Sequence, residues 1–212
     1  MNRLCLTIAL SLALSGCSVF GVRSGTEQTK YEVVDRVLDS VEIRRYETRL
    51  AAEVTVAANS EDDPANSAFR ILARYIFGAN RARSDIAMTS PVEIQGEPVE
   101  IAMTAPVEMT KPEAEQMTMR FFLPASITLE NAPQPDDDRI RIYALPASTV
   151  ATITFTGLRT DTAFQRERAE LLKTLGKSDW RPTDEPVGLY YDPPWTIPFL
   201  RRNEVAVTVV AN

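Results

Sequence analysis

The sequence of 212 residues contains no histidine. Histidine is the usual general base of enzymes, a common metal ligand and the usual axial ligand of haem iron. Its absence excludes Ser-His-Asp and Cys-His catalytic sites, and also any haem site in which a histidine holds the iron. The sequence also lacks a glycine-rich phosphate-binding loop, which argues against P-loop chemistry.

Cysteine is almost as scarce, with only Cys5 and Cys17 in the sequence. Both lie in an N-terminal segment with three zones: a basic start at Arg3, an apolar run of about eleven residues at 4–14, and small residues directly before Cys17. This order is typical of a secretory signal peptide. The apolar run is too short for a membrane span, which needs about 20 residues.

Residues 14–17 (Leu-Ser-Gly-Cys) resemble a bacterial lipobox, whose cysteine receives a diacylglycerol with palmitate-type chains and becomes the new N-terminus. We expect residues 1–16 to be a signal peptide and Cys17 to be lipidated, rather than an ordinary signal peptide with a chance cysteine. Residues 17–30 should then form a flexible linker, because they are small, polar and contain glycine. No thiol would be left for catalysis, metal binding or a disulfide.

Ser18 follows the predicted lipidated cysteine. An aspartate there commonly retains a lipoprotein at the inner membrane, whereas serine resembles the default signal for the outer membrane. We therefore expect the protein in the cell envelope, lipid-anchored at the periplasmic face of the outer membrane.

Positive charge is also in deficit, with 23 Lys and Arg against 29 Asp and Glu and a net charge of −6. Loss of Arg3 with the signal peptide would make the net charge one unit more negative. A mildly acidic protein lacks the positively charged surface that binds the phosphates of nucleic acid, so we expect no nucleic-acid partner. It should also not adhere to anionic lipid by charge, so its contact with a membrane would be the acyl anchor.

From Tyr31 onward, many short stretches are rich in Val, Ile, Thr and aromatic residues, which pack well on a pleated sheet. Several alternate with period 2, and Val205, Val207 and Val209 form one apolar face. The predicted strands are 31–37, 41–46, 52–57, 86–94, 99–109, 117–123, 140–145, 150–155, 187–191 and 204–210.

Two stretches are predicted to be helices. The first should follow Asp63 as the N-cap, with Pro64 at the first helical position and Gly78 at the end. Its inner face would consist of Ala68, Leu72, Tyr75 and Ile76. The second should run from about Asp161 to Leu175 and end at Gly176. Its inner face would consist of Phe164, Arg168, Leu171, Leu172 and Leu175.

Two sets of short matches indicate an internal repeat. Residues 43–46 (Ile-Arg-Arg-Tyr) resemble 140–143 (Ile-Arg-Ile-Tyr), and 52–56 resemble 151–155 at nearly the same offset. Each pair precedes a predicted helix at a similar distance, although matches this short also arise by chance. We expect an α+β fold in which duplicated β-α-β-β units form one antiparallel sheet or distorted barrel with two helices on it.

A shorter repeat is clearer. Residues 86–94 (Ile-Ala-Met-Thr-Ser-Pro-Val-Glu-Ile) recur as 101–109 (Ile-Ala-Met-Thr-Ala-Pro-Val-Glu-Met), with the turn residues Gly-Glu-Pro at 96–98 between them. The repeat predicts a paired hairpin arm, and strand pairing alone is sufficient to explain it.

Residues 75–80 (Tyr-Ile-Phe-Gly-Ala-Asn), followed by 86–92, resemble the central signature of the SOUL haem-binding protein family. Residues 191–195 (Tyr-Asp-Pro-Pro-Trp) and 198–205 (Pro-Phe-Leu-Arg-Arg-Asn-Glu-Val) are similar to its C-terminal signature. The resemblance covers nearly all of the mature chain, so residues 31–212 are identified as one SOUL-like domain. It implies the duplicated β-α-β-β fold, which this family shares with bacterial effector-binding domains.

The resemblance implies binding of haem, another tetrapyrrole or a similar small, flat, apolar ligand. Axial ligation by histidine is impossible here, which leaves a hydrophobic groove beside the first helix, with basic side chains near the propionates. Haem would then be held non-covalently and without a histidine ligand. The ligand-binding residues would be Phe69, Arg70, Ala73, Arg74, Phe77, Met88, Met103, Tyr191 and Trp195.

Each of these assignments has a structural alternative. The two arginines lie four residues apart on one helix face, where guanidinium groups suit carboxylates but are commonly just solvated. The two methionines either ligate iron through sulfur or fill gaps in the core. The aromatic residues, stiffened by three prolines, form either a wall for a flat ligand or a plug that closes the sheet.

Two other classes of function remain open. An envelope scaffold or interaction lipoprotein without a small ligand would be consistent with the missing histidine, and an open apolar groove beside residues 69–77 would argue against it. A carboxylate-dependent hydrolase, as in some relatives of the effector-binding fold, would use Glu93, Glu100 and Glu108 on the paired arm. Acids that alternate on an exposed strand face more commonly serve solubility and edge protection.

Overall fold

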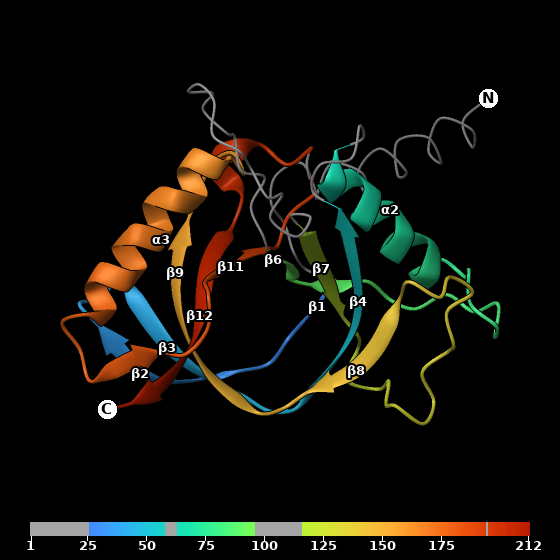
Figure 1. Ribbon diagram of the computed structural model, residues 1–212, viewed down its shortest axis with the longest axis horizontal. Coiled ribbons are helices and arrows are strands. Elements are labelled where there is room, and N and C mark those ends of the chain that lie inside the picture. Colours follow the sequence, from blue (N-terminus) through green and yellow to red (C-terminus); the bar gives the residue numbers. More distant parts are fainter. Residues whose placement is uncertain (1–25, 58–62, 96–115, 194) are drawn as a thin grey trace, which may run out of the picture.

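The computed structural model describes residues 26–57, 63–95, 116–193 and 195–212. In these ranges the chain is an α+β fold, in which a curled antiparallel sheet carries two helices (Figure 1). The strands are β1 Glu27–Gln28, β2 Glu32–Val37, β3 Val41–Tyr46, β4 Arg49–Ala57, β5 Thr89–Ser90, β6 Val92–Gln95, β7 Gln116–Phe122, β8 Arg141–Leu145, β9 Ser148–Phe155, β10 Trp180–Pro182, β11 Val187–Tyr190 and β12 Asn203–Ala211. The helices are α2 Pro64–Ile76, α3 Asp161–Leu175 and the 3-10 turn η1 Pro198–Leu200.

The order of strands in the main sheet is β2-β3-β9-β12-β11-β6-β7-β4-β8. In the predicted repeat, β3, β4, α2, β6 and β7 of the first unit correspond to β8, β9, α3, β11 and β12 of the second. The sheet order is symmetric under this correspondence, and the two units meet where β11 pairs with β6. The sheet is thus built from two equivalent units, as the repeat predicts.

Helix α2 begins and ends where the sequence predicts. The Asp63 carboxylate accepts a hydrogen bond of 3.0 Å from the Ala65 N–H, and Pro64 occupies the first turn. Gly78 follows the C-cap Phe77 with a φ of +92°, a conformation that glycine adopts without strain. All four residues predicted for the inner face are buried: Ala68, Leu72, Tyr75 and Ile76.

Helix α3 covers the second unit in the same way, with Thr160 as its N-cap. Leu171 and Leu175 are buried, and Phe164 packs against the edge of the same core. Arg168 was predicted for the inner face but is half-exposed and donates to Glu185 at 2.8 Å, because burying a charge without a partner is costly. Neither helix of the described ranges is long and apolar enough to cross a membrane.

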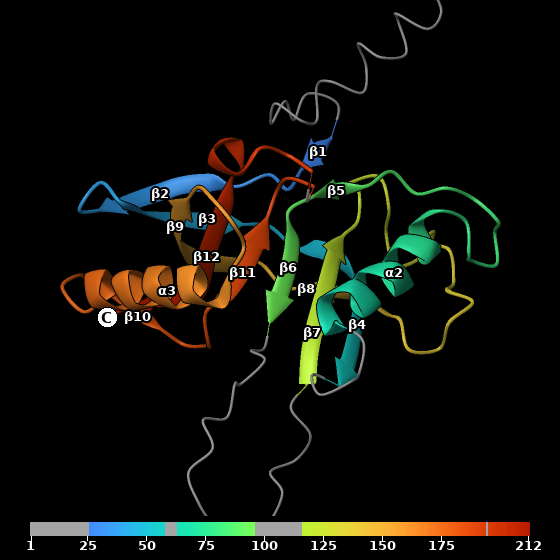
Figure 2. The ribbon, with the colours of Figure 1, turned by 90° about the horizontal axis from the view of Figure 1, so that it is seen from above.

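Both helices cover the same face of the sheet. Leu50, Ala52 and Val54 of β4 pack under α2, and the strand register carries this face across to Ile153 and Val205 under α3. Figure 2 shows α2 beside β4 and β7, and α3 beside β10 and β12. The opposite face, here named the helix-free face, carries an apolar cluster of Tyr46, Val150, Leu189, Tyr191 and Ala206.

Some segments differ from their predictions. Glu27–Gln28 lies within the predicted flexible linker, yet these residues form β1 and pair in parallel with β5, a non-local contact that composition does not reveal. The predicted strand 86–94 is split into β5 and β6 around Pro91, which has no N–H to donate to a ladder. Strand β10 was not predicted, and it pairs with the end of β12. The predicted strand 99–109 lies outside the described residues.

Asn80 holds together the loop that follows α2. Its buried side chain donates to the carbonyls of Tyr75 at 3.0 Å and Ser84 at 2.7 Å. Because the alanine variant leaves these groups unpaired, we expect Asn80→Ala to lower the free energy of unfolding by about 2 kcal/mol in urea denaturation. Asn66→Ala, which removes an exposed bond to Asp63, should change it by less than about 0.5 kcal/mol. Equal losses for the two variants would contradict this role of Asn80.

Candidate functional site

A groove of about 430 Å³ runs along α2, and we name it the α2 groove. Its lining consists of Phe69, Arg70, Ala73, Arg74, Phe77 and Ala79. The first five are residues that the sequence resemblance assigns to a ligand, so the fold brings them to one surface. The groove offers apolar contact area together with two guanidinium groups that can bond carboxylates.

Helical geometry places these side chains in one stripe. Positions three and four residues apart lie on the same side of a helix, next to the stripe that α2 buries in the core. Phe69 is 40% exposed, and its ring meets that of Phe121 edge-on with the centroids 5.5 Å apart. Phe77 is 66% exposed and ends the stripe just before the Gly78 turn. The groove thus carries accessible aromatic surface at both ends.

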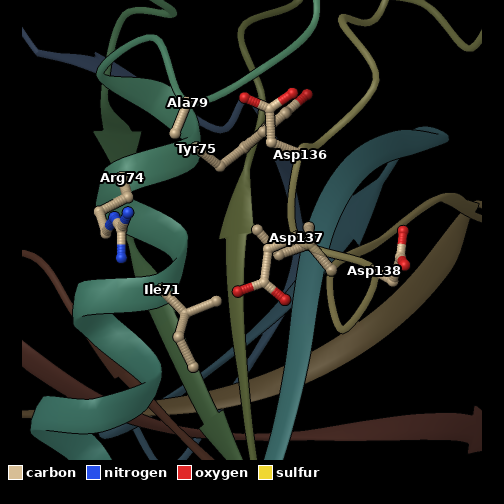
Figure 3. Close-up of a pocket in the computed structure, with 8 residues that line it drawn as sticks. Ile71, Arg74, Tyr75, Ala79, Asp136, Asp137 and Asp138 are labelled. Carbon is tan, nitrogen blue, oxygen red and sulfur yellow. The ribbon is translucent and has the colours of Figure 1, made fainter.

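A second cavity of about 450 Å³ shares Arg74 and Ala79 with the α2 groove, and we name it the acidic pocket. Its lining includes three aspartates, residues 136–138, and Figure 3 shows the Asp137 carboxylate directed toward Ile71 and Arg74 of α2, whereas that of Asp138 points away from the helix. A hydrogen bond from Arg139 lowers the pKa of Asp137, and the positive charge of Arg74 lowers it further. The negative charge of this pocket would repel anionic groups on its side of Arg74.

The other predicted ligand residues lie elsewhere. Tyr191 is buried on the helix-free face, where its hydroxyl donates to Glu204 at 2.8 Å. Trp195 is exposed on the loop between β11 and β12, and Met88 is exposed before β5. None of the three lines the α2 groove or the acidic pocket. Met103 falls outside the described residues.

Glu204 is the centre of a buried ion cluster on the helix-free face. Its carboxylate accepts two hydrogen bonds from Arg44, at 2.7 and 3.0 Å, and others from Arg202, Tyr191 and Thr154. Burial alone would raise the pKa of Glu204, but Arg44 and the other donors hold it below its usual range. Burial and the charge of Glu204 raise the pKa of Tyr191. The cluster ties β12 to β3 and β9, which gives this part of the C-terminal signature a structural role.

A second ion cluster lies on the same face in the first unit. Glu53 accepts hydrogen bonds from Arg120 at 2.6 Å, Arg141 at 2.7 Å and the Tyr143 hydroxyl at 2.9 Å. Arg120 also pairs with Glu93, which is buried. The expectation of an exposed Glu93 is therefore wrong, because the register of β6 with β7 places it opposite Arg120. Glu100 and Glu108 lie outside the described residues, among which no three His, Cys, Asp or Glu side chains could hold a metal ion.

Sequence reasoning missed one residue of the α2 groove and most of the acidic pocket. Ala79 lies within the 75–80 signature, but its methyl group carries no chemical signal. Residues 136–138 reach α2 through a non-local contact, in which the Asp136 N–H donates to the Ala79 carbonyl at 3.3 Å. A run of three aspartates before a strand was the available signal for the pocket.

Residues 26–208 match the protein family described as SOUL heme-binding protein. The chain therefore belongs to the SOUL family. A curated relative is Heme-binding protein 1 of Xenopus tropicalis, which is 29% identical over 191 residues. This match covers 89% of the present chain and 93% of the relative. The family match begins at residue 26, so it includes β1.

Solved structures share the fold at low sequence identity. The EcmrR C-terminal domain superposes with a TM-score of 0.55 at 12% identity, covering 86% of this chain and 99% of that domain. An uncharacterized conserved protein from Listeria innocua reaches 0.56 at 12% identity, with 81% and 92% covered. A hydrolase from the same organism reaches 0.54 at 12% identity, with the same coverage. These similarities confirm the predicted effector-binding-like fold and show the fold alone.

Proposed function

We propose that this protein is an envelope lipoprotein whose SOUL domain binds haem, or a similar flat apolar molecule with carboxylates, in the α2 groove. The observation that carries the proposal is the α2 groove itself, which gathers Phe69, Phe77 and two arginines on one helix face. An open groove beside α2 also favours a ligand over the alternative of a scaffold without one. The names of the family and of its Xenopus relative support haem as the ligand.

The groove suits the periphery of haem. Its volume of about 430 Å³ lies within the usual range of ligand pockets, about 300–1,000 Å³. Phe69, Ala73 and Phe77 would contact the apolar ring. Arg70 and Arg74 would bond the propionates, and the adjacent acidic pocket would keep these anionic groups on the arginine side.

The groove does not supply a ligand for iron. None of its six lining residues is His, Cys, Met or Tyr. Tyr75 lines the neighbouring acidic pocket, where its hydroxyl donates to the Pro133 carbonyl at 2.8 Å, and burial raises its pKa to about 12. Binding would therefore rest on contacts to the ring and its carboxylates, while the bound group itself would supply any redox or gas chemistry.

Titration of the soluble domain with hemin tests the groove. We expect a Soret shift and tryptophan quenching with a micromolar Kd, and a Kd at least about tenfold weaker for the double variant Arg70→Glu with Arg74→Glu. Reversing both charges replaces two attractions to the propionates with two repulsions. The matched control is Arg166→Glu with Lys173→Glu on the exposed side of α3, which makes the same change in net charge.

Two results would reject this site. Absence of any Soret shift at micromolar hemin would remove haem as the ligand. A shift that is the same in the α2 double variant, the α3 double variant and the wild type would mean that hemin adheres elsewhere.

A further inference from the structure

One arginine on the helix-free face, Arg49, has no carboxylate partner among the residues that the structure describes. Within the described ranges, five arginines on this face form salt bridges with glutamates: Arg36, Arg44, Arg120, Arg141 and Arg202. The side chain of Arg49, the first residue of β4, forms no hydrogen bond or salt bridge with any residue of the described ranges. Arg49 is thus a positive charge that belongs to neither of the two ion clusters on this face.

Aromatic rings surround the Arg49 guanidinium. Its central carbon lies 4.1 Å from the centroid of the Tyr46 ring and 4.9 Å from that of Phe122. The Nε atom is buried without a hydrogen-bond partner among the described residues, and the only other such side-chain atom there is Ser90 Oγ. Arg49 as a whole is half-buried, and its two terminal nitrogens are not among the buried unpaired atoms. These nitrogens therefore keep some contact with solvent on the helix-free face.

An arginine in this position should weaken the fold unless an anion joins it. Burial lowers the pKa of Arg49, but a guanidinium remains protonated in proteins. The nearby Glu93 attracts Arg49, yet its carboxylate is already paired with Arg120. Contacts with the two rings offset only part of the cost of removing water from the inner side of this charge, where Nε has no partner among the described residues. Methionine would fill the space between the rings without that cost.

We propose that Arg49 is a second binding site, which takes the carboxylate of a small organic acid from the helix-free face. The two terminal nitrogens offer parallel donors that match the two oxygens of a carboxylate. The rings of Tyr46 and Phe122, each 3% exposed, make the surroundings of the guanidinium apolar and favour an acid with an aromatic or apolar body. The site is independent of the α2 groove and of haem, because Arg49 and Leu50 lie on opposite faces of β4.

Benzoate is the probe for this site, measured by calorimetry and by chemical shifts of the full soluble domain. We expect saturable binding to the wild type with a millimolar Kd, and a Kd at least about tenfold weaker for Arg49→Met. Without benzoate, Arg49→Met should melt at a higher temperature than the wild type, because it removes the unpaired charge. The control is Arg45→Met on β3, which loses an exposed salt bridge and should keep benzoate binding.

Three outcomes would overturn the proposal: no saturable benzoate binding by the wild type, undiminished binding by Arg49→Met, or tight binding of inorganic phosphate with none of benzoate. If Arg49→Met fails to fold, Arg49→Lys keeps the charge but loses the paired donors, and it should bind benzoate more weakly. The double variant Arg70→Glu with Arg74→Glu, which should bind hemin more weakly, should bind benzoate like the wild type. Failure of one site is therefore distinguishable from failure of the other.

Discussion

Replacement of Glu204 with glutamine should lower the free energy of unfolding by about 3–5 kcal/mol, the largest single loss that we expect in this domain. The Glu204 side chain is completely buried, and that of Arg44 is 2% exposed. The neutral amide leaves the Arg44 charge in the core without its main partner, and water cannot replace that partner. Arg202 also loses its carboxylate contact at 2.7 Å.

Urea denaturation of three variants measures this effect. Glu32→Gln breaks an exposed pair with Arg45 and should cost less than about 1 kcal/mol. The double variant Arg44→Met with Glu204→Leu removes both buried charges and should recover much of the loss, because the penalty comes from the charge left unpaired. If Glu204→Gln unfolds at the same urea concentration as the wild type, the cluster does not hold the sheet together.

The pH dependence of stability gives a second measure of the same cluster. Because the folded protein holds the pKa of Glu204 below its usual value, the carboxylate stabilises the fold above the unfolded pKa of about 4.3. This contribution is lost as the pH falls through the lower pKa of the folded state. The difference in stability between the wild type and Glu204→Gln should therefore be full at pH 7 and shrink below about pH 4.

Local signals made much of the fold predictable. Asp63 and Pro64 mark the start of α2 because capping and proline preferences depend only on neighbouring residues. The spacing of Ala68 and Leu72 identifies the buried face for the same reason. The repeat goes further, since two equivalent β-α-β-β units fix the symmetric order of the sheet. Helical spacing also predicts that Arg70 and Phe77 lie on one side of the helix, and both line the α2 groove.

The partners of charged and aromatic residues were not predictable from the sequence. Arg44 and Glu204 are separated by 160 positions, and nothing in the sequence around either residue shows that they form a contact. A tyrosine can line a ligand site or donate a hydrogen bond to a buried carboxylate, and the sequence does not distinguish the two. The pairing of β11 with β12 brings the Tyr191 hydroxyl to Glu204. Arg49 reads as an ordinary surface arginine, because the sequence cannot show that its ion-pair partners are missing.

Replacement of Cys17 with serine should move the protein from the membrane fraction to a soluble or unprocessed form. The acyl chains expected on Cys17 each contribute about 0.8 kcal/mol per buried methylene, so several chains on one residue hold firmly. Serine has no sulfur to receive the diacylglycerol. The described domain offers no helix that could take over the anchoring. Cell fractionation with carbonate washing measures the change, and it should be nearly complete.

The control for this prediction is Cys5→Ser, which lies in the expected signal peptide and should leave the protein in the membrane fraction. A Cys17→Ser protein that is processed and still fractionates like the wild type would rule out lipid anchoring. Sorting between the two membranes is a separate step, read by a receptor from the residue after the cysteine. We expect the wild type to band with outer membranes on a density gradient and Ser18→Asp to shift to the inner membrane. A wild type that already bands with inner membranes would remove the sorting claim and leave the anchor intact.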